Sequence, residues 1–483
     1  MKIMFTRVFF ALLIFTGCES ADKAGPDFSG YVPAFSVTGD VERVFVMDRE
    51  SAGQFEGTRI NDDGAAFSAV LLADVVKVAS SRARDYSLLL VGVDGLAAMI
   101  SGEDLNGCYI TYSSEYAWQC INFNHPVSSR IKMLYEIVVV AGENSEDPMA
   151  TGLVDAAGSR RVSAGRLRLS PHEAGLNFEG RSEKNGKAVT VFTPYRRIPL
   201  GSLLETQGMI CFVGRNGAMI YERNIGTAFL EVAGNTLRYR NMYDVAGVMA
   251  DAPMLNISEV YRDALYFLER GEQVLIIELD GWGWEMYLRA EQPYLGGLNA
   301  MKALAVFPPL SPVGLASMLT GELPAVHGIH DRTNREPAAE DIFAMAAAMG
   351  KKAIYIEGNT SLIRTSLPPV LSPDLNGVNG TDDEVYANAK VAMVENPDLL
   401  FVHFHGIDDV AATYGPYAPE TLAKIFYIDA LVAELAAAWS GRIIITADHG
   451  LHLTSNEISG GGDHGVFRAE DMLVPYIITR GGE

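Results

Sequence analysis

The chain has 483 residues, of which 48% are hydrophobic and 20% are charged. This length exceeds one ordinary core and predicts roughly two to four domains, and the composition is that of a globular protein rather than a disordered one. Sixty acidic against 38 basic residues give a formal net charge of -22. Because a nucleic-acid backbone is bound by basic patches, this balance argues against a nucleic-acid partner. It agrees with binding of divalent cations, although a solvated acidic surface is the more common reason for such a balance.

Residues 1–17 have the pattern of an export signal. The basic residues Lys2 and Arg7 precede the apolar run 8–15, which is too short to span a bilayer. The segment Phe15-Thr16-Gly17-Cys18 resembles a bacterial lipobox. The resemblance implies that Cys18 is the first mature residue and carries a lipid, with residues 18–30 as a tether. It predicts an exported, lipid-anchored lipoprotein of the bacterial cell envelope that reaches the membrane through Cys18. The alternative is an ordinary signal peptide.

Residues 31–145 are predicted to form a small mixed domain of strands and one helix. Apolar residues recur at helical spacing over 67–79, and strands are predicted at 86–93, closed by an Asp94-Gly95 turn, and at 131–140. This order resembles the molybdopterin-binding domain of the sulfite oxidase family. That family binds its metal through a cysteine in a basic pocket, whereas Cys108 and Cys120 flank an aromatic, non-basic stretch. We therefore expect the fold without molybdopterin, and a disulfide between these cysteines would contribute about 3 kcal/mol.

Residues 155–253 are predicted to form a second β-rich domain. The segment 195–204 is expected to begin a helix, and 209–217 is expected to be a strand that ends in an Asn-Gly turn. Gly, Pro and Ala cluster at 156–159 and at 251–253, which indicates boundaries there. The order of elements resembles that of the preceding domain and suggests a degenerate repeat.

Residues 255–483 alternate strand and helix patterns, which is typical of a doubly wound, mostly parallel sheet of the α/β class. Three apolar runs have the continuous pattern of strands covered on both faces. They lead into Asp280-Gly281, into Asp408, and into Asp448-His449-Gly450. Ligands of open parallel sheets bind beyond the carboxyl ends of the strands, so these side chains should converge. Helices are predicted at 381–395, opened by a Thr381–Glu384 capping box, and at 419–438.

An ordered set of motifs in this last segment resembles the alkaline phosphatase superfamily, most closely its nucleotide pyrophosphatase/phosphodiesterase and phosphonoacetate hydrolase branch. The set comprises Asp280-Gly281, Ser311, Thr320-Gly321, Pro324-Ala325-Val326-His327-Gly328-Ile329, Asp448-His449-Gly450 and Asp463-His464-Gly465. The resemblance implies an alkaline phosphatase-like catalytic domain. It also implies an enzyme that hydrolyses phosphodiesters, phosphomonoesters or phosphonates with the help of divalent metal.

The resemblance assigns roles to individual side chains. One metal site would consist of Asp280, Ser311, Asp448 and His449, and the Ser311 hydroxyl would also be the nucleophile that forms a covalent intermediate. Asp408 and His464 would belong to a second site. Carboxylates mixed with imidazoles suit zinc, with manganese or iron as alternatives. One or two metal ions and a small phosphorylated substrate are therefore expected.

The second metal site departs from the family pattern. Relatives carry a histidine four residues after the aspartate, whereas this chain has Ala412 after Asp408. A methyl group cannot coordinate a metal, so the site keeps two ligands unless His405, Asp409 or His452 replaces the missing one.

The vacancy leaves a second class of function open, a binding or scaffolding lipoprotein that has lost catalysis and holds one metal or none. Outside the two sites, His327 is expected to be structural. His403 is expected to be a satisfied core histidine because it lies within a predicted strand.

Overall fold

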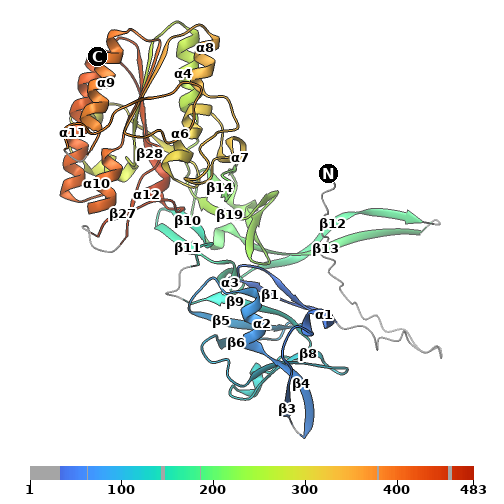
Figure 1. The fold of residues 1–483 in the computed structure, drawn as a ribbon. Helices are drawn as coiled ribbons and strands as arrows, with labels where there is room; N and C mark the ends of the chain where they lie inside the picture. The colour runs from blue at the N-terminus through green and yellow to red at the C-terminus, as the bar shows by residue number, and fades with distance from the viewer. Residues whose placement is uncertain are drawn as a thin grey trace.

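The computed structural model describes residues 33–62, 64–142, 147–184, 187–377, 380–454 and 460–482. These residues form two β-rich units followed by a larger α/β domain, arranged in a row (Figure 1). The export signal at 1–17, Cys18 and the tether at 18–30 lie outside the described residues. Within the described ranges, each helix is too short or too polar to cross a bilayer.

The C-terminal domain is built on a seven-stranded sheet with the order β21-β28-β25-β20-β24-β22-β23. The central strand β20 runs parallel to both neighbours, β24 and β25, while β28 pairs antiparallel with β25, and the edge strand β21 pairs antiparallel with β28. This topology confirms the mostly parallel α/β sheet. The strands are β20 (Val274–Leu279), β21 (Met301–Leu304), β22 (Ala353–Glu357), β23 (Val370–Leu371), β24 (Leu399–Phe404), β25 (Arg442–Thr446) and β28 (Leu473–Arg480).

Helices cover both faces of this sheet (Figure 1). On one side lie α4 (Glu259–Glu269) and α8 (Ile342–Ala348), and on the other lie α9 (Asp382–Val394) and α11 (Pro419–Ala438). All residues of β20 and β24 are therefore buried, which explains why these strands are apolar except for Glu278 and His403. Helix α11 has the predicted bounds. Helix α9 begins one residue after Thr381, whose side chain makes no capping hydrogen bond among the described residues.

The first unit contains a five-stranded sheet of order β2-β1-β9-β5-β6 and a four-stranded sheet of order β3-β4-β7-β8. The predicted helix at 67–79 is shorter, because residues 65–71 form β4 and pair with β3 and β7. The resemblance to the sulfite oxidase family stays a prediction. The elements are β1 (Phe35–Gly39), β2 (Phe45–Met47), α1 (Arg49–Ala52), β3 (Thr58–Asp62), β4 (Ala65–Leu71), α2 (Leu72–Ala79), β5 (Tyr86–Gly92), β6 (Ala97–Ser101), β7 (Cys108–Ser113), β8 (Ala117–Asn122) and β9 (Leu134–Ala141).

Cys108 and Cys120, which could have closed a small loop, form no disulfide with each other, and both are free, buried thiols. Across β7 and β8, Cys108 lies opposite Asn122, and Cys120 lies opposite Ile110. The two cysteines are therefore diagonal neighbours, with Cα atoms about 7–8 Å apart in an ordinary sheet, whereas a disulfide joins Cβ atoms about 3.5–4.5 Å apart.

The second unit repeats the strand arrangement of the first. Its sheet β11-β10-β19-β14-β15 matches β2-β1-β9-β5-β6 strand for strand, with a parallel β10–β19 pair in place of the parallel β1–β9 pair. The two sheets thus share one strand order, and the degenerate repeat stays a prediction. The elements are β10 (Thr151–Asp155), β11 (Gly158–Val162), α3 (Ala164–Leu167), β12 (Glu173–Lys184), β13 (Lys187–Pro199), β14 (Ile210–Gly214), β15 (Met219–Glu222), β16 (Phe229–Ala233), β17 (Thr236–Tyr239), β18 (Met242–Tyr243) and β19 (Val245–Met249).

Two details of this unit differ from the sequence-based expectation. Its first strand already begins at Thr151, and the residues at 156–159 belong to the β10–β11 hairpin, in which Asp155 pairs with Gly158. The segment expected to begin a helix at 195 continues strand β13 to Pro199, because it pairs with both β12 and β16. The hairpin of β12 and β13 projects from the body of the protein (Figure 1).

The second unit packs against the C-terminal α/β domain through a shared apolar cluster. This cluster includes Val154, Val213, Leu304 and Phe467. The Phe467 ring lies against the backbone of Gly152 and Gly247, where an added Cβ would collide with it. Because Phe467 is three residues after His464, this packing anchors the loop that carries His464.

Candidate metal centre

Three neighbouring parallel strands end at the same edge of the C-terminal sheet. Asp280 follows β20, Asp408 lies in the first turn of α10 (Gly406–Tyr414) after β24, and Asp448 and His449 follow β25. Ser311 is the first residue of α6 (Ser311–Thr320), a helix buried along its whole length. The structure therefore gathers these side chains, as the convergence of strand ends requires.

Four of the predicted ligands form one buried group around Nε2 of His449. This nitrogen lies 3.2 Å from Ser311 Oγ, 3.3 Å from Asp448 Oδ2 and 3.5 Å from Asp280 Oδ1. Ser311 Oγ lies 3.4 Å from Asp280 Oδ1. The other ring nitrogen, Nδ1, is 3.2 Å from the carbonyl oxygen of Gly450. A carbonyl can only accept, so Nδ1 carries the proton and Nε2 presents a lone pair to the group.

These distances fit a divalent cation. Zinc–nitrogen and zinc–oxygen bonds of about 2.1 Å in a tetrahedron place ligand atoms about 3.4 Å apart. The four separations given above are close to that value. In addition, Asp448 Oδ2 is buried and has no hydrogen-bond partner among the described residues, which is costly unless a cation compensates it.

The electrostatics of the group also favour a cation. Burial, together with the charge of Asp280, raises the pKa of Asp448 and that of Asp408 to about 7. Burial and then the charge of His464 lower the pKa of His449, so its imidazole is neutral and able to coordinate. Three carboxylates packed together repel one another, and a divalent cation between them removes that repulsion.

Asp408 and His464 also come together, with His449, in a second group. His464 Nε2 lies 3.9 Å from Asp408 Oδ1, and its ring stacks on that of His449 with centroids 3.9 Å apart. His464 Nδ1 donates to the carbonyl of Pro309 at 2.9 Å. Its Nε2 accepts a hydrogen bond of 3.0 Å from the guanidinium of Arg332. The lone pair that a metal would use is thus directed at an arginine.

The residues considered as replacements at the Ala412 position do not complete this second group. Ala412 lies one helical turn after Asp408 on α10 and is exposed. His452 Nδ1 pairs with Asp471 at 2.7 Å. His405 pairs with Asp280, and Asp409 joins none of the candidate ligand groups of the described residues. The group therefore keeps two of its family ligands, together with His449.

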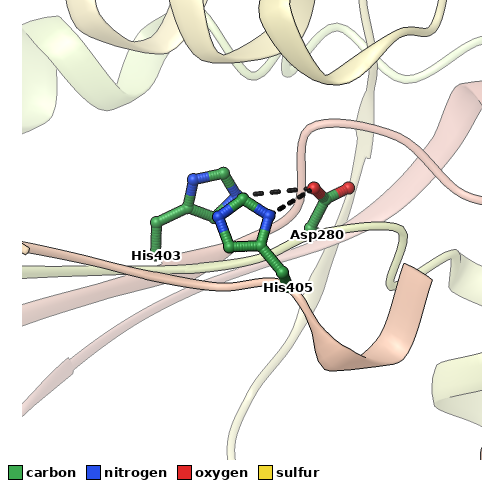
Figure 2. A group of neighbouring side chains, drawn as sticks. All are labelled: Asp280, His403 and His405. Carbon is green, nitrogen blue, oxygen red and sulfur yellow. Dashed lines mark hydrogen bonds and ion pairs between the residues drawn. The ribbon is translucent and has the colours of Figure 1, made fainter. Parts of the chain in front are cut away.

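Sequence reasoning missed two features of the site. Nε2 of His403, expected to be satisfied in the core, has no hydrogen-bond partner among the residues described. Figure 2 shows the rings of His403 and His405 facing the Asp280 carboxylate. Two histidines at alternate positions where a strand ends were the available signal. No sequence pattern points to Arg332, because it contacts His464 from a loop that lies 132 residues away in the chain.

Comparisons with known proteins agree with this architecture. Residues 274–474 match the family described as type I phosphodiesterase/nucleotide pyrophosphatase. No curated protein matches the chain.

Among solved structures, the chain is similar to phosphonoacetate hydrolase from Sinorhizobium meliloti 1021 in complex with phosphonoformate, at 21% identity and a TM-score of 0.34 over 40% of this chain and 59% of that one. It is similar to murine ectonucleotide pyrophosphatase/phosphodiesterase 5 in complex with AMP, at 20% identity and a TM-score of 0.32 over 38% and 59%. It is also similar to the human counterpart, at 15% identity and a TM-score of 0.36 over 44% and 90%. The chain thus spans about three fifths of the first two structures.

Proposed function

We propose that this protein is a metal-dependent hydrolase of small phosphoesters or phosphonates, because residues 274–474 match the type I phosphodiesterase/nucleotide pyrophosphatase family and their motifs resemble the alkaline phosphatase superfamily. Ser311 is its nucleophile, and zinc is its metal. The observation that carries the proposal is the spacing of Ser311, Asp280, Asp448 and His449, which fits one tetrahedral cation. The protein acts at the bacterial cell envelope, where the lipid on Cys18 anchors it.

The chain's own residues prepare Ser311 for attack. Its hydroxyl lies at the N-terminus of α6, where the helix dipole stabilises negative charge on the oxygen and on a bound phosphoryl group. Asp280 and His449 fix the oxygen from two sides. When bound, the divalent cation supplies Lewis-acid chemistry, which favours the deprotonated hydroxyl and offsets charge on the phosphoryl oxygens.

The reaction proceeds in two displacements at phosphorus. In the first, Ser311 Oγ forms a bond to phosphorus while the bond to the leaving oxygen breaks, and the leaving group departs with a proton. In the second, a water oxygen attacks the phosphoserine, the bond from phosphorus to Oγ breaks, and the serine hydroxyl regains its proton. The products are the alcohol and the phosphate or phosphate monoester. With a phosphonate the first bond broken joins phosphorus to carbon, the departing carbon takes up the proton, and the product formed in place of the alcohol has a new C–H bond.

Arg332 supplies a fixed positive charge where Ala412 leaves the second group short of a ligand. Its guanidinium is held by His464 and is exposed at the mouth of the group. A guanidinium presents paired donors that match two phosphoryl oxygens. We infer that Arg332 binds the phosphoryl group next to His464.

A second candidate function is a scaffolding or binding lipoprotein without turnover. Ala412 favours it, because the family histidine is lost, and so does the bond from Arg332 to His464 Nε2. The first candidate explains more, since the Ser311 group retains all four of its ligands.

Turnover separates the two candidates. The zinc-loaded protein is assayed on p-nitrophenyl phosphate, bis-p-nitrophenyl phosphate and phosphonoacetate. Ser311→Ala is compared with a control at an exposed serine, Ser440→Ala. We expect turnover that chelation abolishes, and a loss of at least about 1,000-fold in Ser311→Ala but not in the control. Turnover unaffected by Ser311→Ala would contradict the nucleophile, and no turnover on any substrate would support the scaffold.

A further inference from the structure

The carboxylate of Asp280 has two sides, and each faces a different set of donors. Its Oδ1 faces Ser311 and His449. Its Oδ2 lies 3.2 Å from His405 Nδ1 and 3.6 Å from His403 Nε2, on the far side (Figure 2). The second set takes no part in the proposed reaction. His403 lies on β24 and His405 directly follows this strand. Both face the side of the Asp280 carboxylate that points away from Ser311 and His449.

A second carboxylate points into the same space. Glu278, on β20, is fully buried, and its Oε1 lies 3.6 Å from His403 Nε2. Neither of its oxygens, nor His403 Nε2, has a hydrogen-bond partner in the part of the chain that the structure describes. Three unsatisfied polar atoms facing one another in a core are costly unless something between them binds them all.

Glu357 holds both imidazoles in the orientation that a metal requires. It lies 3.0 Å from His403 Nδ1 and 2.5 Å from His405 Nε2. The backbone amide of Gly358 and the hydroxyl of Tyr355 donate to Glu357 and keep it in place. A carboxylate behind each ligating histidine is the usual arrangement in metal sites, because it fixes the tautomer and directs the opposite nitrogen. Here the opposite nitrogens are directed at Asp280 and Glu278.

We propose that His403 Nε2, His405 Nδ1 and Asp280 Oδ2, which lie within 4.8 Å of one another, form an inner site for a divalent cation of the zinc class. The separations of 3.2 and 3.6 Å from Asp280 Oδ2 are close to the roughly 3.4 Å between ligands in a tetrahedral zinc site. Two imidazoles and one carboxylate form a suitable three-ligand set for zinc, and the Glu278 carboxylate beside His403 adds negative charge that favours the cation.

Charge balance favours a cation over protons alone. Without one, protonating both histidines, whose rings lie only 3.9 Å apart, would offset two of the three negative charges of Glu278, Asp280 and Glu357. Two imidazolium ions at that separation repel each other in a buried site. A divalent cation offsets the same two charges while both imidazoles stay neutral and ligating.

Asp280 then bridges two cations, one beside Ser311 and one behind it. A two-cation centre of this kind does not need the ligand missing at Ala412. The inference rests on the proposed function for its catalytic meaning, whereas the inner site itself is argued from its own donors.

Zinc stoichiometry tests the inner site. The metal-free full chain is titrated with zinc alone, by calorimetry and by metal analysis after desalting. We expect two tight equivalents in the wild type, one in His403→Phe, one in His449→Phe and none in the double variant. The buried control His327→Asn, which lies outside both sites, retains two. Glu278→Gln keeps the shape of the site and weakens one of the two equivalents by about 10-fold or more.

The outcomes distinguish this inference from the proposed function. Two equivalents that survive in both His403→Phe and Glu278→Gln with unchanged affinity would overturn the inner site. A single equivalent, lost in His449→Phe and kept in His403→Phe, would overturn it too and leave the proposed function standing. Circular dichroism and thermal unfolding check the fold of each variant. If His403→Phe does not fold, the zinc affinity of the isosteric variant Glu278→Gln tests the inner site instead.

Discussion

Gly314 of α6 packs directly against Asp448, so closely that a Cβ at position 314 would lie 2.7 Å from the Asp448 Cβ and 2.9 Å from its carbonyl oxygen. This contact sets the distance between the helix that begins with Ser311 and the strand end that carries Asp448 and His449. Ser311 and His449, 138 residues apart in the chain, meet at 3.2 Å because of it.

Replacing Gly314 by Ala should therefore damage the metal centre. The added methyl must displace backbone and costs about 1–3 kcal/mol of unfolding free energy. The same displacement widens the Ser311–Asp448–His449 group, so zinc affinity and turnover should fall. Gly297→Ala is the control, since an added Cβ there meets nothing within 4 Å. Urea unfolding and zinc titration measure both effects. Equal behaviour of the two variants would contradict the packing argument.

Ala412→His should restore a ligand to the second group. On α10 the new imidazole follows Asp408 by four residues and lies on the same face of the helix. We expect an additional zinc equivalent, or tighter binding by about 10-fold or more, with higher turnover. The control is Thr413→His, which places the imidazole one position further along α10, where it faces another direction. This variant should change neither zinc binding nor turnover. A gain in both variants, or in neither, would count against the vacancy at 412.

Arg332 should bind the phosphoryl group. Arg332→Ala is expected to lower kcat/KM by about 100-fold, because it removes a fixed positive charge from the charged reaction centre. Arg332→Lys should recover only part of the loss, since an ammonium cannot match two oxygens at once. The control is Arg335→Ala, a neighbouring exposed arginine that donates to the carbonyl of Ser361 instead. An unchanged kcat/KM in Arg332→Ala would remove Arg332 from the site.

His327 should make the protein sensitive to acid. Burial, and then the charge of His330, lower the pKa of His327 to about 4. Its Nδ1 accepts from the Ile329 amide at 3.1 Å, and its Nε2 pairs with Ser317 at 2.9 Å, so the neutral ring is satisfied. A folded-state pKa below the unfolded value of about 6.5 means that the unfolded chain takes up the proton first. The stability from His327 is thus fully present above pH 6.5 and lost as pH falls towards 4.

The loss over this window should amount to at most about 3 kcal/mol. In His327→Asn, which keeps an acceptor for Ile329, the decline of unfolding free energy between pH 6.5 and 4 should be shallower by that amount. His172→Asn, at an exposed histidine, should keep the wild-type profile. Urea unfolding across the pH range gives the comparison, and parallel profiles of wild type and His327→Asn would refute the assignment.

The sequence predicted the parts of the fold that follow from periodicity. Strands β20, β24 and β25 are mostly apolar, and a parallel sheet brings their carboxyl ends together, so Asp280, Asp448 and His449 could be placed near one another in advance. The β12–β13 hairpin could not be placed, because the segment at 195–204 has an apolar spacing that also suits a helix, and pairing with β12 and β16 decided it.

The inner site could not be predicted from the sequence, for a different reason. His403 and Glu278 lie inside apolar strands, where single polar residues are usually satisfied by the core. Only the register of β20 against β24, which places Glu278 beside His403, shows that they face each other. Contacts between distant loops, such as Arg332 with His464, leave no periodic trace in the chain.

The most direct test of the account is an anomalous diffraction map from crystals of the full chain grown with zinc. The account predicts a zinc ion about 2.0–2.2 Å from His449 Nε2 and from oxygens of Ser311, Asp280 and Asp448. A map with no ion beside Ser311, or with zinc bound only at other sites, would contradict it.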